Sequence, residues 1–294
     1  MRIRLVLLAL LLAATASAQR PLVPHPPGPP LGVPFTINLA SPQAVNLVGW
    51  WPIAEPNAGG AILHVRSLWH RHGTLTAMDP ATDFVPDGTK GLALDFDGVN
   101  DYVALADIDL STGITIALWV KPATLPAGHI ALVIKGAPST AATNYALRHT
   151  ASGKLIFSYY SGVFHDYTTN AVVLSVGTWT HVAFSYSFGV GSSVAMYVDG
   201  SVVGGSWTSG TGNSLPTTND LKVELGAFNL TTSRVQFYTG KMVDVRISDR
   251  ALSASEVWQS YAAETRYDLY RREGPWAIAI AQAPPAGTTI PPIL

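Results

Sequence analysis

Paired carboxylates are the first residues to consider for catalytic chemistry. Retaining glycoside hydrolysis needs two carboxyl groups about 5 to 5.5 Å apart, which on a strand means acidic residues two or four positions apart on one face. Asp95 and Asp97 have this spacing, but they flank a turn, where carboxylates more often accept hydrogen bonds from backbone amides. No glutamate belongs to an E-x-D-x-x-E run; the five are Glu55, Glu224, Glu256, Glu264 and Glu273. We therefore expect no catalytic carboxylate pair.

Nucleophile, phosphate and metal motifs give no stronger indication of chemistry. The G-x-S-x-G motif is absent, and the Gly-rich segments 189–191 and 204–212 lack the rest of a phosphate-binding fingerprint, so we interpret them as hairpin connections. His70 and His72 are two residues apart and would share a metal on a strand, whereas the alternative is a polar loop. We predict that the protein is not an enzyme and has no catalytic residue.

Aromatic side chains are the candidates for ligand binding. The C–H faces of sugars stack on apolar rings, while nearby polar groups fix their orientation. The segment YYSGVFHDY and the Gly/Ser/Thr-rich segment that follows it supply six candidate ligand-binding residues: Tyr159, Tyr160, Phe164, His165, Tyr167 and Trp207. The alternative is that these rings pack in the core, because a β protein with 8 Trp, 11 Tyr and 9 Phe also gathers aromatic residues there.

The first eighteen residues have the pattern of a secretory signal peptide. Arg2 and Arg4 precede an apolar run at 5–14, and small residues at 16–18 precede the expected cleavage site. The run is too short to span a bilayer core of about 30 Å. We expect a secreted protein, extracellular or at the cell surface, with no membrane span in its mature form. The chain has no Cys, which excludes disulfides.

Charge and composition indicate one domain between two flanks. The formal charge is −1, and −3 after loss of the leader, with no basic cluster, which argues against a nucleic-acid partner. Residues 47–262 are long enough for one sandwich core. A Pro-rich linker with eight prolines precedes them at 19–46, after the signal peptide at 1–18, and a tail follows at 263–294. The linker composition favours extended polyproline conformation and predicts a spacer.

Alternating apolar and polar residues predict a succession of short strands. Ile114, Ile116, Leu118 and Val120 alternate with Thr115, Ala117, Trp119 and Lys121, so we expect one dry face and one wetter face. The pair Asp199-Gly200 between two such runs predicts a two-residue type I′ hairpin, because both positions accept positive φ.

One helix is expected near the end of the domain. Ser253 and Glu256 have the spacing of a capping box, in which side chains and backbone N–H groups satisfy each other. Ala254, Val257, Trp258 and Tyr261 follow at helical spacing and predict an apolar stripe.

Five sequence blocks together resemble a known family. They are GLALDFDGVNDYVAL (91–105), ITIALWVKP (114–122), WTHVAFSY (179–186), MYVDGSVVG (196–204) and VDVRISDRALSASEV (243–257). Their types, order and spacing over residues 48–260 resemble the LamG-like, concanavalin A-like jelly-roll family. The resemblance implies an all-β fold, an antiparallel two-sheet jelly-roll sandwich with one short C-terminal helix.

The same resemblance implies calcium as a cofactor. Relatives hold Ca²⁺ at a sheet rim through Asp side chains and backbone carbonyls, which suits a hard cation that prefers six to eight oxygens. The matching positions are Asp97, Asp101 and Asp244, although Val243 stands where many relatives have a second acid. The alternative is that Asp244 pairs with Arg246 and that Asp97 caps its own turn.

The function that these observations favour is a non-catalytic, secreted binding module. Carbohydrate recognition or adhesion at a cell surface, with a glycan or another extracellular partner, is the first expectation. The alternative is a structural subunit of an extracellular assembly, such as a filament, a surface layer or a virion decoration. Such a subunit would self-associate through its Pro-rich flanks and a tail strand expected at 276–281.

Overall fold

The structure is a computed structural model of the whole chain, and it describes residues 35–53, 62–63, 71–87, 90–137, 142–262 and 268–272. The expected signal peptide, the first part of the Pro-rich linker and the expected tail strand lie outside the described residues, as does His70.

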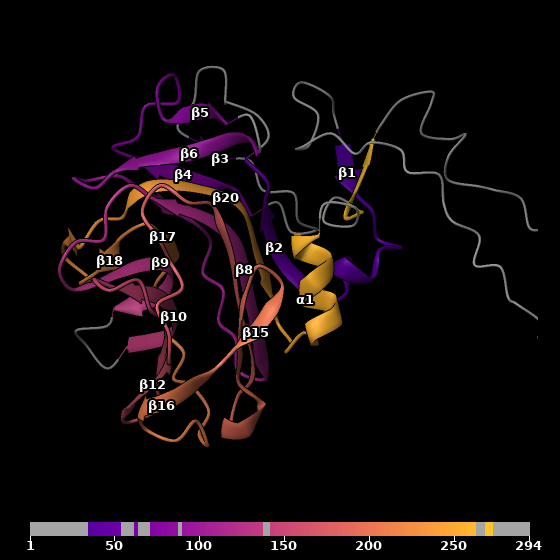
Figure 1. Ribbon diagram of the computed structural model, residues 1–294, viewed down its shortest axis with the longest axis vertical. Coiled ribbons are helices and arrows are strands. Elements are labelled where there is room, and N and C mark those ends of the chain that lie inside the picture. Colours follow the sequence, from indigo (N-terminus) through magenta and orange to yellow (C-terminus); the bar gives the residue numbers. More distant parts are fainter. Residues whose placement is uncertain are drawn as a thin grey trace, which may run out of the picture.

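Two large antiparallel sheets form a jelly-roll sandwich, as the sequence predicted (Figure 1). The nine-stranded sheet has the order β16 (Gly205–Ser209), β12 (Phe164–Thr169), β11 (Leu155–Tyr160), β10 (Ala142–Thr150), β9 (His129–Ala137), β17 (Val223–Leu225), β7 (Tyr102–Ala104), β4 (Gly73–Thr76) and β3 (Ile62–Leu63). The eight-stranded sheet has the order β15 (Ser201–Val203), β14 (Ala195–Val198), β13 (Thr180–Ser187), β8 (Gly113–Pro122), β20 (Thr239–Ser248), β6 (Gly91–Asp97) and β5 (Phe84–Asp87), with β2 (Leu47–Trp51) paired to β20.

The remaining elements are small and lie around the sandwich. They are the helix α1 (Ala254–Tyr261), the 3₁₀ turns η1 (Pro42–Ala44) and η2 (Gly191–Ser193), and two short strand pairs. One pair joins β18 (Phe228–Asn229) to β19 (Arg234–Val235), and the other joins β1 (Phe35–Ile37) to β21 (Tyr270–Arg272). No helix of the described residues is long and apolar enough to cross a membrane.

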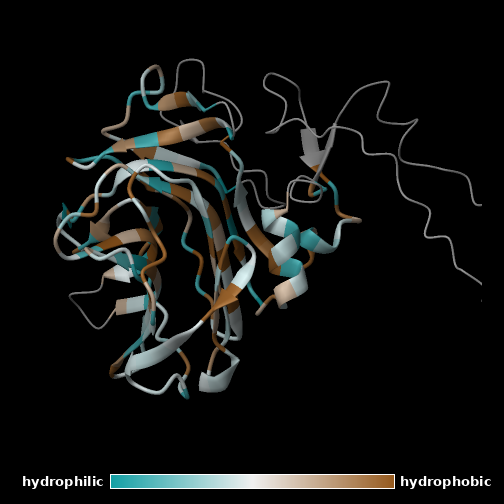
Figure 2. Cartoon of the chain, in the orientation of Figure 1, coloured by the Kyte–Doolittle hydropathy of each residue, from teal (hydrophilic) through white to brown (hydrophobic). Residues whose placement is uncertain are grey.

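The core lies between the two sheets because alternate side chains of each strand point inward. Brown and paler bands alternate along the strands in Figure 2. In β8, Ile114, Ile116, Leu118 and Val120 are fully buried and pack against residues such as Phe157 of the opposite sheet.

The outer face of β8 is also dry, which differs from our expectation of a wetter face. Thr115, Ala117 and Trp119 are all buried. The reason is that α1 covers this side of the eight-stranded sheet (Figure 1): Ala117 packs with Val257, and the ring of Trp119 stacks on Tyr261 at 5.5 Å.

Both locally encoded motifs are confirmed. The hairpin between β14 and β15 has φ of 48° at Asp199 and 74° at Gly200, as a type I′ turn requires. The capping box of α1 is complete, with reciprocal bonds between Ser253 and Glu256. The apolar stripe is narrower than predicted, because Val257 is buried whereas Trp258 is 49% exposed.

Regular structure also extends into residues that the sequence assigned to the linker and the tail. The strands β1 and β21 pair so that Phe35 lies opposite Arg272. Beside them, Leu47, Trp50 and Leu269 form a small buried cluster. The two ends of the described chain therefore meet at one place, close to α1 (Figure 1).

Candidate functional site

Two of the six predicted ligand residues are core residues. Tyr159 is fully buried, and His165, opposite it on β12, is 3% exposed; their rings stack with centroids 4.5 Å apart. The Tyr159 hydroxyl donates to the carbonyl of Ser214 at 2.9 Å. The packing alternative therefore describes these two residues, whose rings are closed to a ligand.

The hydrogen bonds of His165 determine its tautomer. Its Nδ1 accepts from the backbone N–H groups of Thr211 (3.1 Å) and Gly212 (3.0 Å), so Nδ1 carries no proton. Its Nε2–H is then the donor to Ser161 Oγ at 2.8 Å. Burial lowers the pKa of His165, which keeps the ring neutral and able to accept. His165 thus anchors the loop that follows β16.

Tyr167 and Trp207 also turn inward. They lie opposite each other on β12 and β16, with ring centroids 5.4 Å apart. The indole N–H of Trp207 donates to the carbonyl of Gly191 at 3.0 Å. Both rings are half-buried and pack against the main core, so they close the sandwich next to the edge strand β16.

Tyr160 and Phe164 point to the opposite face of the sheet and remain accessible. They are directly paired across the β11–β12 hairpin, and their rings meet edge to face at 5.1 Å. Both are only half-buried. Adjacent residues of a strand point to opposite faces, so Tyr159 packs in the core while Tyr160 lies outside.

A partly buried ion pair lies beside these two rings on the same outer face. Arg148 Nη2 on β10 contacts Asp166 Oδ1 on β12 at 2.9 Å, and Ser158 between them bonds to both. The guanidinium side chain is 11% exposed, but the carboxylate is 28% exposed. Burial lowers the pKa of Arg148, and the nearby Asp166 opposes that shift.

We call this group the outer-face patch and define it as Arg148, Ser158, Tyr160, Phe164 and Asp166. Asp166 and Phe164 are two residues apart on one strand, hence about 7 Å apart, and they face Ser158 and Tyr160 on the next strand. Thr168 and Thr208 extend the patch to the sheet edge with a hydroxyl contact of 3.0 Å. The patch combines ring edges with a rigid, solvent-facing hydrogen-bond acceptor. The spacing in sequence did not indicate Arg148 and Ser158, which the strand register brings to Asp166.

The three residues implied for calcium do not form one site. Asp97 Oδ1 accepts from the backbone N–H of Val99 at 2.7 Å, as the turn-capping alternative predicted, and Asp101 Oδ2 accepts from Asp97 N at 2.9 Å. Asp97 lies opposite Thr239, five residues before Asp244, and so about 16 Å from it along the strand.

Asp244 is also committed to other partners, as the second alternative predicted. Its carboxylate accepts from Trp50 Nε1 at 2.6 Å and pairs with Arg246, whose Nε and Nη2 each lie 3.0 Å away. Within the described residues, no cluster of three or more His, Asp or Glu side chains could hold a metal ion. Asp244 does not fit a shared calcium site, and calcium binding at Asp97 and Asp101 stays a prediction.

The glutamates among the described residues, Glu224 and Glu256, both make contacts that support the fold. Glu224 on β17 is 1% exposed and accepts from Arg234 Nη2 at 2.5 Å and from Asn229 Nδ2 at 3.1 Å. Glu256 belongs to the helix cap. Both glutamate carboxylates are therefore occupied by contacts within the fold.

The buried contacts of Asn229 predict that its glycosylation sequon, Asn229-Leu230-Thr231, is not used. Asn229 is 2% exposed, and the nitrogen that would carry the glycan donates to Glu224. Secretion from a eukaryotic host should give a protein whose mass does not change on glycosidase treatment. The control is Val172→Thr, which creates a sequon at the exposed Asn170 and should add a removable glycan. A removable glycan on Asn229 would contradict the buried geometry.

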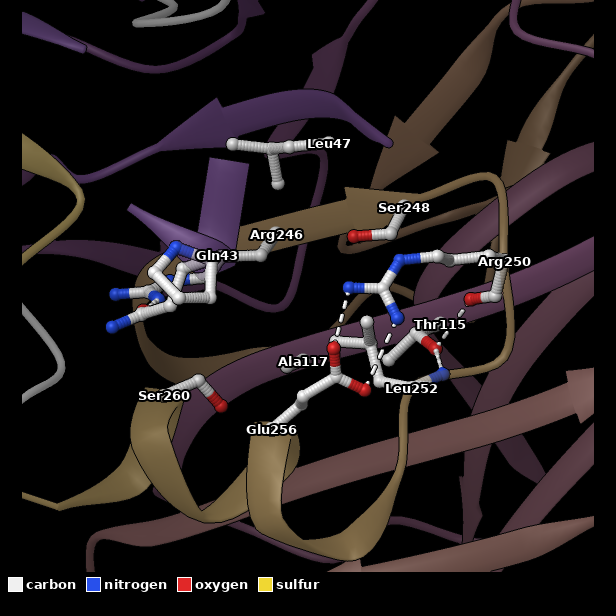
Figure 3. Close-up of a pocket in the computed structure, with 11 residues that line it drawn as sticks. Gln43, Leu47, Thr115, Ala117, Arg246, Ser248, Arg250, Leu252, Glu256 and Ser260 are labelled. Atoms are coloured by element: carbon white, nitrogen blue, oxygen red, sulfur yellow. Dashed lines mark hydrogen bonds and ion pairs between the residues drawn. The ribbon is translucent and has the colours of Figure 1, made fainter. Parts of the chain in front are cut away.

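A cavity of about 20 Å³ lies between α1, η1 and the outer face of β8 and β20 (Figure 3). This volume holds about one water molecule. Its charged lining residues are paired internally, because Arg246 contacts Asp244 and Arg250 contacts Glu256. We interpret it as a packing seam under the helix rather than a ligand site.

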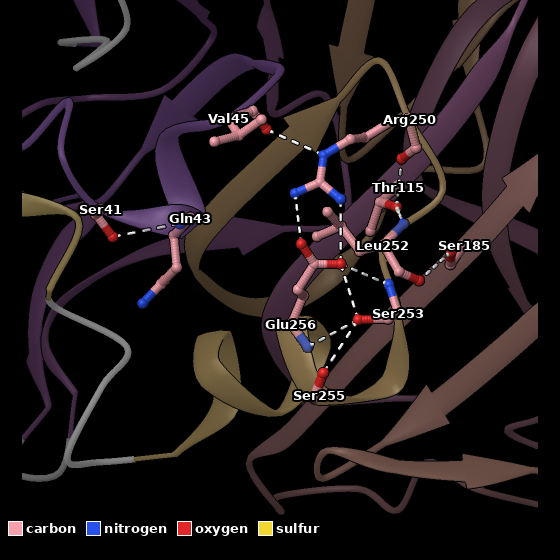
Figure 4. A network of polar contacts seen from close by, with 10 residues as sticks. All are labelled: Ser41, Gln43, Val45, Thr115, Ser185, Arg250, Leu252, Ser253, Ser255 and Glu256. Atoms are coloured by element: carbon pink, nitrogen blue, oxygen red, sulfur yellow. Dashed lines mark hydrogen bonds and ion pairs between the residues drawn. The ribbon is translucent and has the colours of Figure 1, made fainter.

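The cap of α1 leads to a prediction on acid stability. Arg250 Nη2 lies 2.7 Å from Glu256 Oε1, and Ser253 N donates to Oε2 at 2.9 Å (Figure 4). These contacts, Arg250 first, lower the pKa of Glu256 to about 2. The carboxylate therefore stabilises the fold above pH 4.5, and this contribution is lost as the pH falls toward 2.

Glu256→Gln should lower the free energy of unfolding by about 1 kcal/mol at pH 7. The difference from the unmodified protein should shrink between pH 4.5 and 2, as measured by urea unfolding at each pH. A difference that stays constant over this range would contradict the role of the carboxylate charge.

The family model described as the concanavalin A-like lectin/glucanases superfamily matches residues 97–258, more than half of the chain. No curated protein matches the sequence.

Several solved structures share the sandwich. Domain 4 of an extracellular GH43 arabinanase from Geobacillus stearothermophilus, solved with arabinotriose, matches with a TM-score of 0.54 and 21% identity over 74% of this chain and 98% of that domain. The binding domain of Paraclostridial Mosquitocidal Protein 1 matches with a TM-score of 0.52 and 12% identity over 74% and 52% of the two chains. Trypanosoma rangeli sialidase, solved with the inhibitor DANA, matches with a TM-score of 0.51 and 16% identity over 73% of this chain but only 32% of the sialidase. At these identities the likeness establishes the fold.

Proposed function

Because the chain belongs to the concanavalin A-like lectin/glucanases superfamily, we propose that it is a non-catalytic, extracellular binding module that recognises carbohydrate through the outer-face patch. The observation that carries the proposal is the pairing of two accessible rings, Tyr160 and Phe164, with a fixed carboxylate, Asp166, on one face.

The two halves of the patch supply what sugar recognition needs. The rings give an apolar surface for the C–H face of a sugar, and burial of that surface drives contact. The Asp166 carboxylate accepts hydroxyl hydrogens, and Arg148 and Ser158 hold it in place before the ligand arrives. Such preorganisation lowers the ordering cost of binding.

The neighbouring folds support the substrate class. The arabinanase domain was solved with arabinotriose, and the mosquitocidal protein fragment is a binding domain. We also propose that calcium binds at Asp97 and Asp101, separately from the outer-face patch. We include a chelator in the experiment for this reason.

Binding of glycans to the full chain tests the proposal. A glycan array identifies the class of ligand. Titration of the protein with arabinotriose, once in calcium and once in a chelator, measures the affinity. Tyr160→Ala/Phe164→Ala should weaken binding at least tenfold, which corresponds to about 1.4 kcal/mol. The matched control is Trp258→Ala, which removes an exposed ring on α1 at the other sheet. No binding to any glycan, or equal binding by the double variant, would overturn the proposal.

The assembly alternative is favoured by one observation. The pairing of β1 with β21 brings the two ends of the described chain together, so both flanks start from one place. Sedimentation of the full chain distinguishes the two functions. A monomer at micromolar concentration supports the binding module, whereas concentration-dependent large particles support the structural subunit.

A further inference from the structure

We infer that the outer-face patch selects neutral saccharides and rejects acidic ones. This inference rests on the proposed function and concerns the charge that a bound glycan would meet. The charged groups of the patch are Arg148 on β10 and Asp166 on β12, and His129 on β9 lies beside Arg148.

The guanidinium of Arg148 is bonded to other groups of the protein. Its Nη2 bonds to Ser158 and Asp166, and its Nη1 lies 3.5 Å from His129 Nδ1. The guanidinium also lies over the ring of Phe228 at 5.9 Å, which covers it from β18. With 11% of its side chain exposed, Arg148 has little surface left for the forked contact that would recognise a carboxylate or sulfate on a sugar.

Asp166 is the charged group that the solvent meets. Its Oδ1 accepts from both Arg148 and Ser158, while no described residue donates to Oδ2. An ionised carboxylate accepts hydrogen bonds and donates none. Sugar hydroxyls can donate to Oδ2, whereas a sugar carboxylate offers no proton and would place a like charge beside it.

His129 does not reverse this balance at neutral pH. Burial and the neighbouring Arg148 both lower the pKa of His129, so the imidazole is neutral above pH 6.5. The ion pair of Arg148 and Asp166 is neutral in sum, with its negative end outward. The hydroxyl row of Thr168 and Thr208 adds further neutral partners along the same face.

The test compares matched glycans that differ only in charge. The full chain is titrated with arabinotriose, and pairs such as galactotriose with trigalacturonate and lactose with sialyllactose are measured on an array and in solution. We expect the neutral member of each bound pair to bind at least tenfold more tightly at 0.05 M salt. Because salt screens the repulsion, the ratio should fall at 0.5 M salt.

Asp166→Asn separates charge from packing. The amide keeps an acceptor for Arg148 and Ser158 and removes the outward negative charge, so the neutral-to-acidic ratio should fall at least threefold. Asp220→Asn, which changes an exposed carboxylate outside the patch, should leave the ratio unchanged.

The outcomes distinguish the two claims. Equal or tighter binding of the acidic members would overturn this inference and leave the proposed carbohydrate function standing. An unchanged ratio in Asp166→Asn would also overturn it. Failure of every neutral and acidic glycan to bind would overturn the proposed function, and this inference with it.

Discussion

Replacing Asp244 by Ala is expected to lower the free energy of unfolding by about 3 to 5 kcal/mol. Asp244 is 3% exposed and pairs with the buried guanidinium of Arg246, so its removal leaves that charge without its carboxylate. The change also takes away the acceptor of the Trp50 indole N–H. Asp244 has a φ of 56°, a conformation that Ala adopts less readily than Asp or Asn.

Urea unfolding of three variants would measure this effect. Asp244→Asn keeps an acceptor and tolerates the positive φ, so it should lose less stability than Asp244→Ala. Asp220→Ala, at an exposed position with no side-chain partner among the described residues, should change stability by less than about 0.5 kcal/mol. A loss below about 1 kcal/mol for Asp244→Ala would show that the buried network contributes little.

Replacing His165 by Ala is expected to lower the free energy of unfolding by about 2 to 4 kcal/mol at pH 7.5. The change leaves the backbone N–H groups of Thr211 and Gly212 without their acceptor and opens a space under the ring of Tyr159. Both losses fall on the loop that closes the sandwich beside β16.

The difference between the unmodified protein and His165→Ala should also depend on pH. The native pKa of His165 lies below its ordinary value of 6.5, so the unfolded chain takes up the proton first. The stability that this residue contributes is complete above pH 6.5 and is lost as the pH falls below 6.5 through the lowered native pKa. Unfolding measured at pH 7.5, 6 and 5 should show the gap narrowing. A gap that widens toward acid would mean that Nδ1 does not accept these bonds.

The site that emerges is smaller than the aromatic segment suggested. Of six candidate ligand residues, Tyr160 and Phe164 face solvent beside an ion pair, while Tyr159 and His165 are in the core and Tyr167 and Trp207 pack against it. Variants of the outer pair test recognition, whereas variants of the inner group test folding.

Features that depend on neighbours in the chain were predictable from the sequence. The type I′ turn at Asp199-Gly200 follows from the backbone freedom of two residues, and the capping box follows from the reach of Ser253 and Glu256 across one helical turn. The alternation of apolar residues predicted strands and, with the family resemblance, the jelly-roll sandwich.

Features that depend on register or on distant segments required the folded structure. Tyr159 and Tyr160 point to opposite faces of the sheet, and a shift of the strand by one residue would exchange them. Because both are tyrosines, the alternation of residue types in the sequence does not show which of them faces the core. One partner of Asp244, Trp50, is 194 residues away, and Arg148 meets Asp166 only because β11 lies between their strands. Alternation in β8 predicted a wet outer face, yet α1 covers it. The alternation of apolar and polar residues in the sequence indicates where a strand can form and which residues share a face. The packing of other elements determines which of its faces meets water.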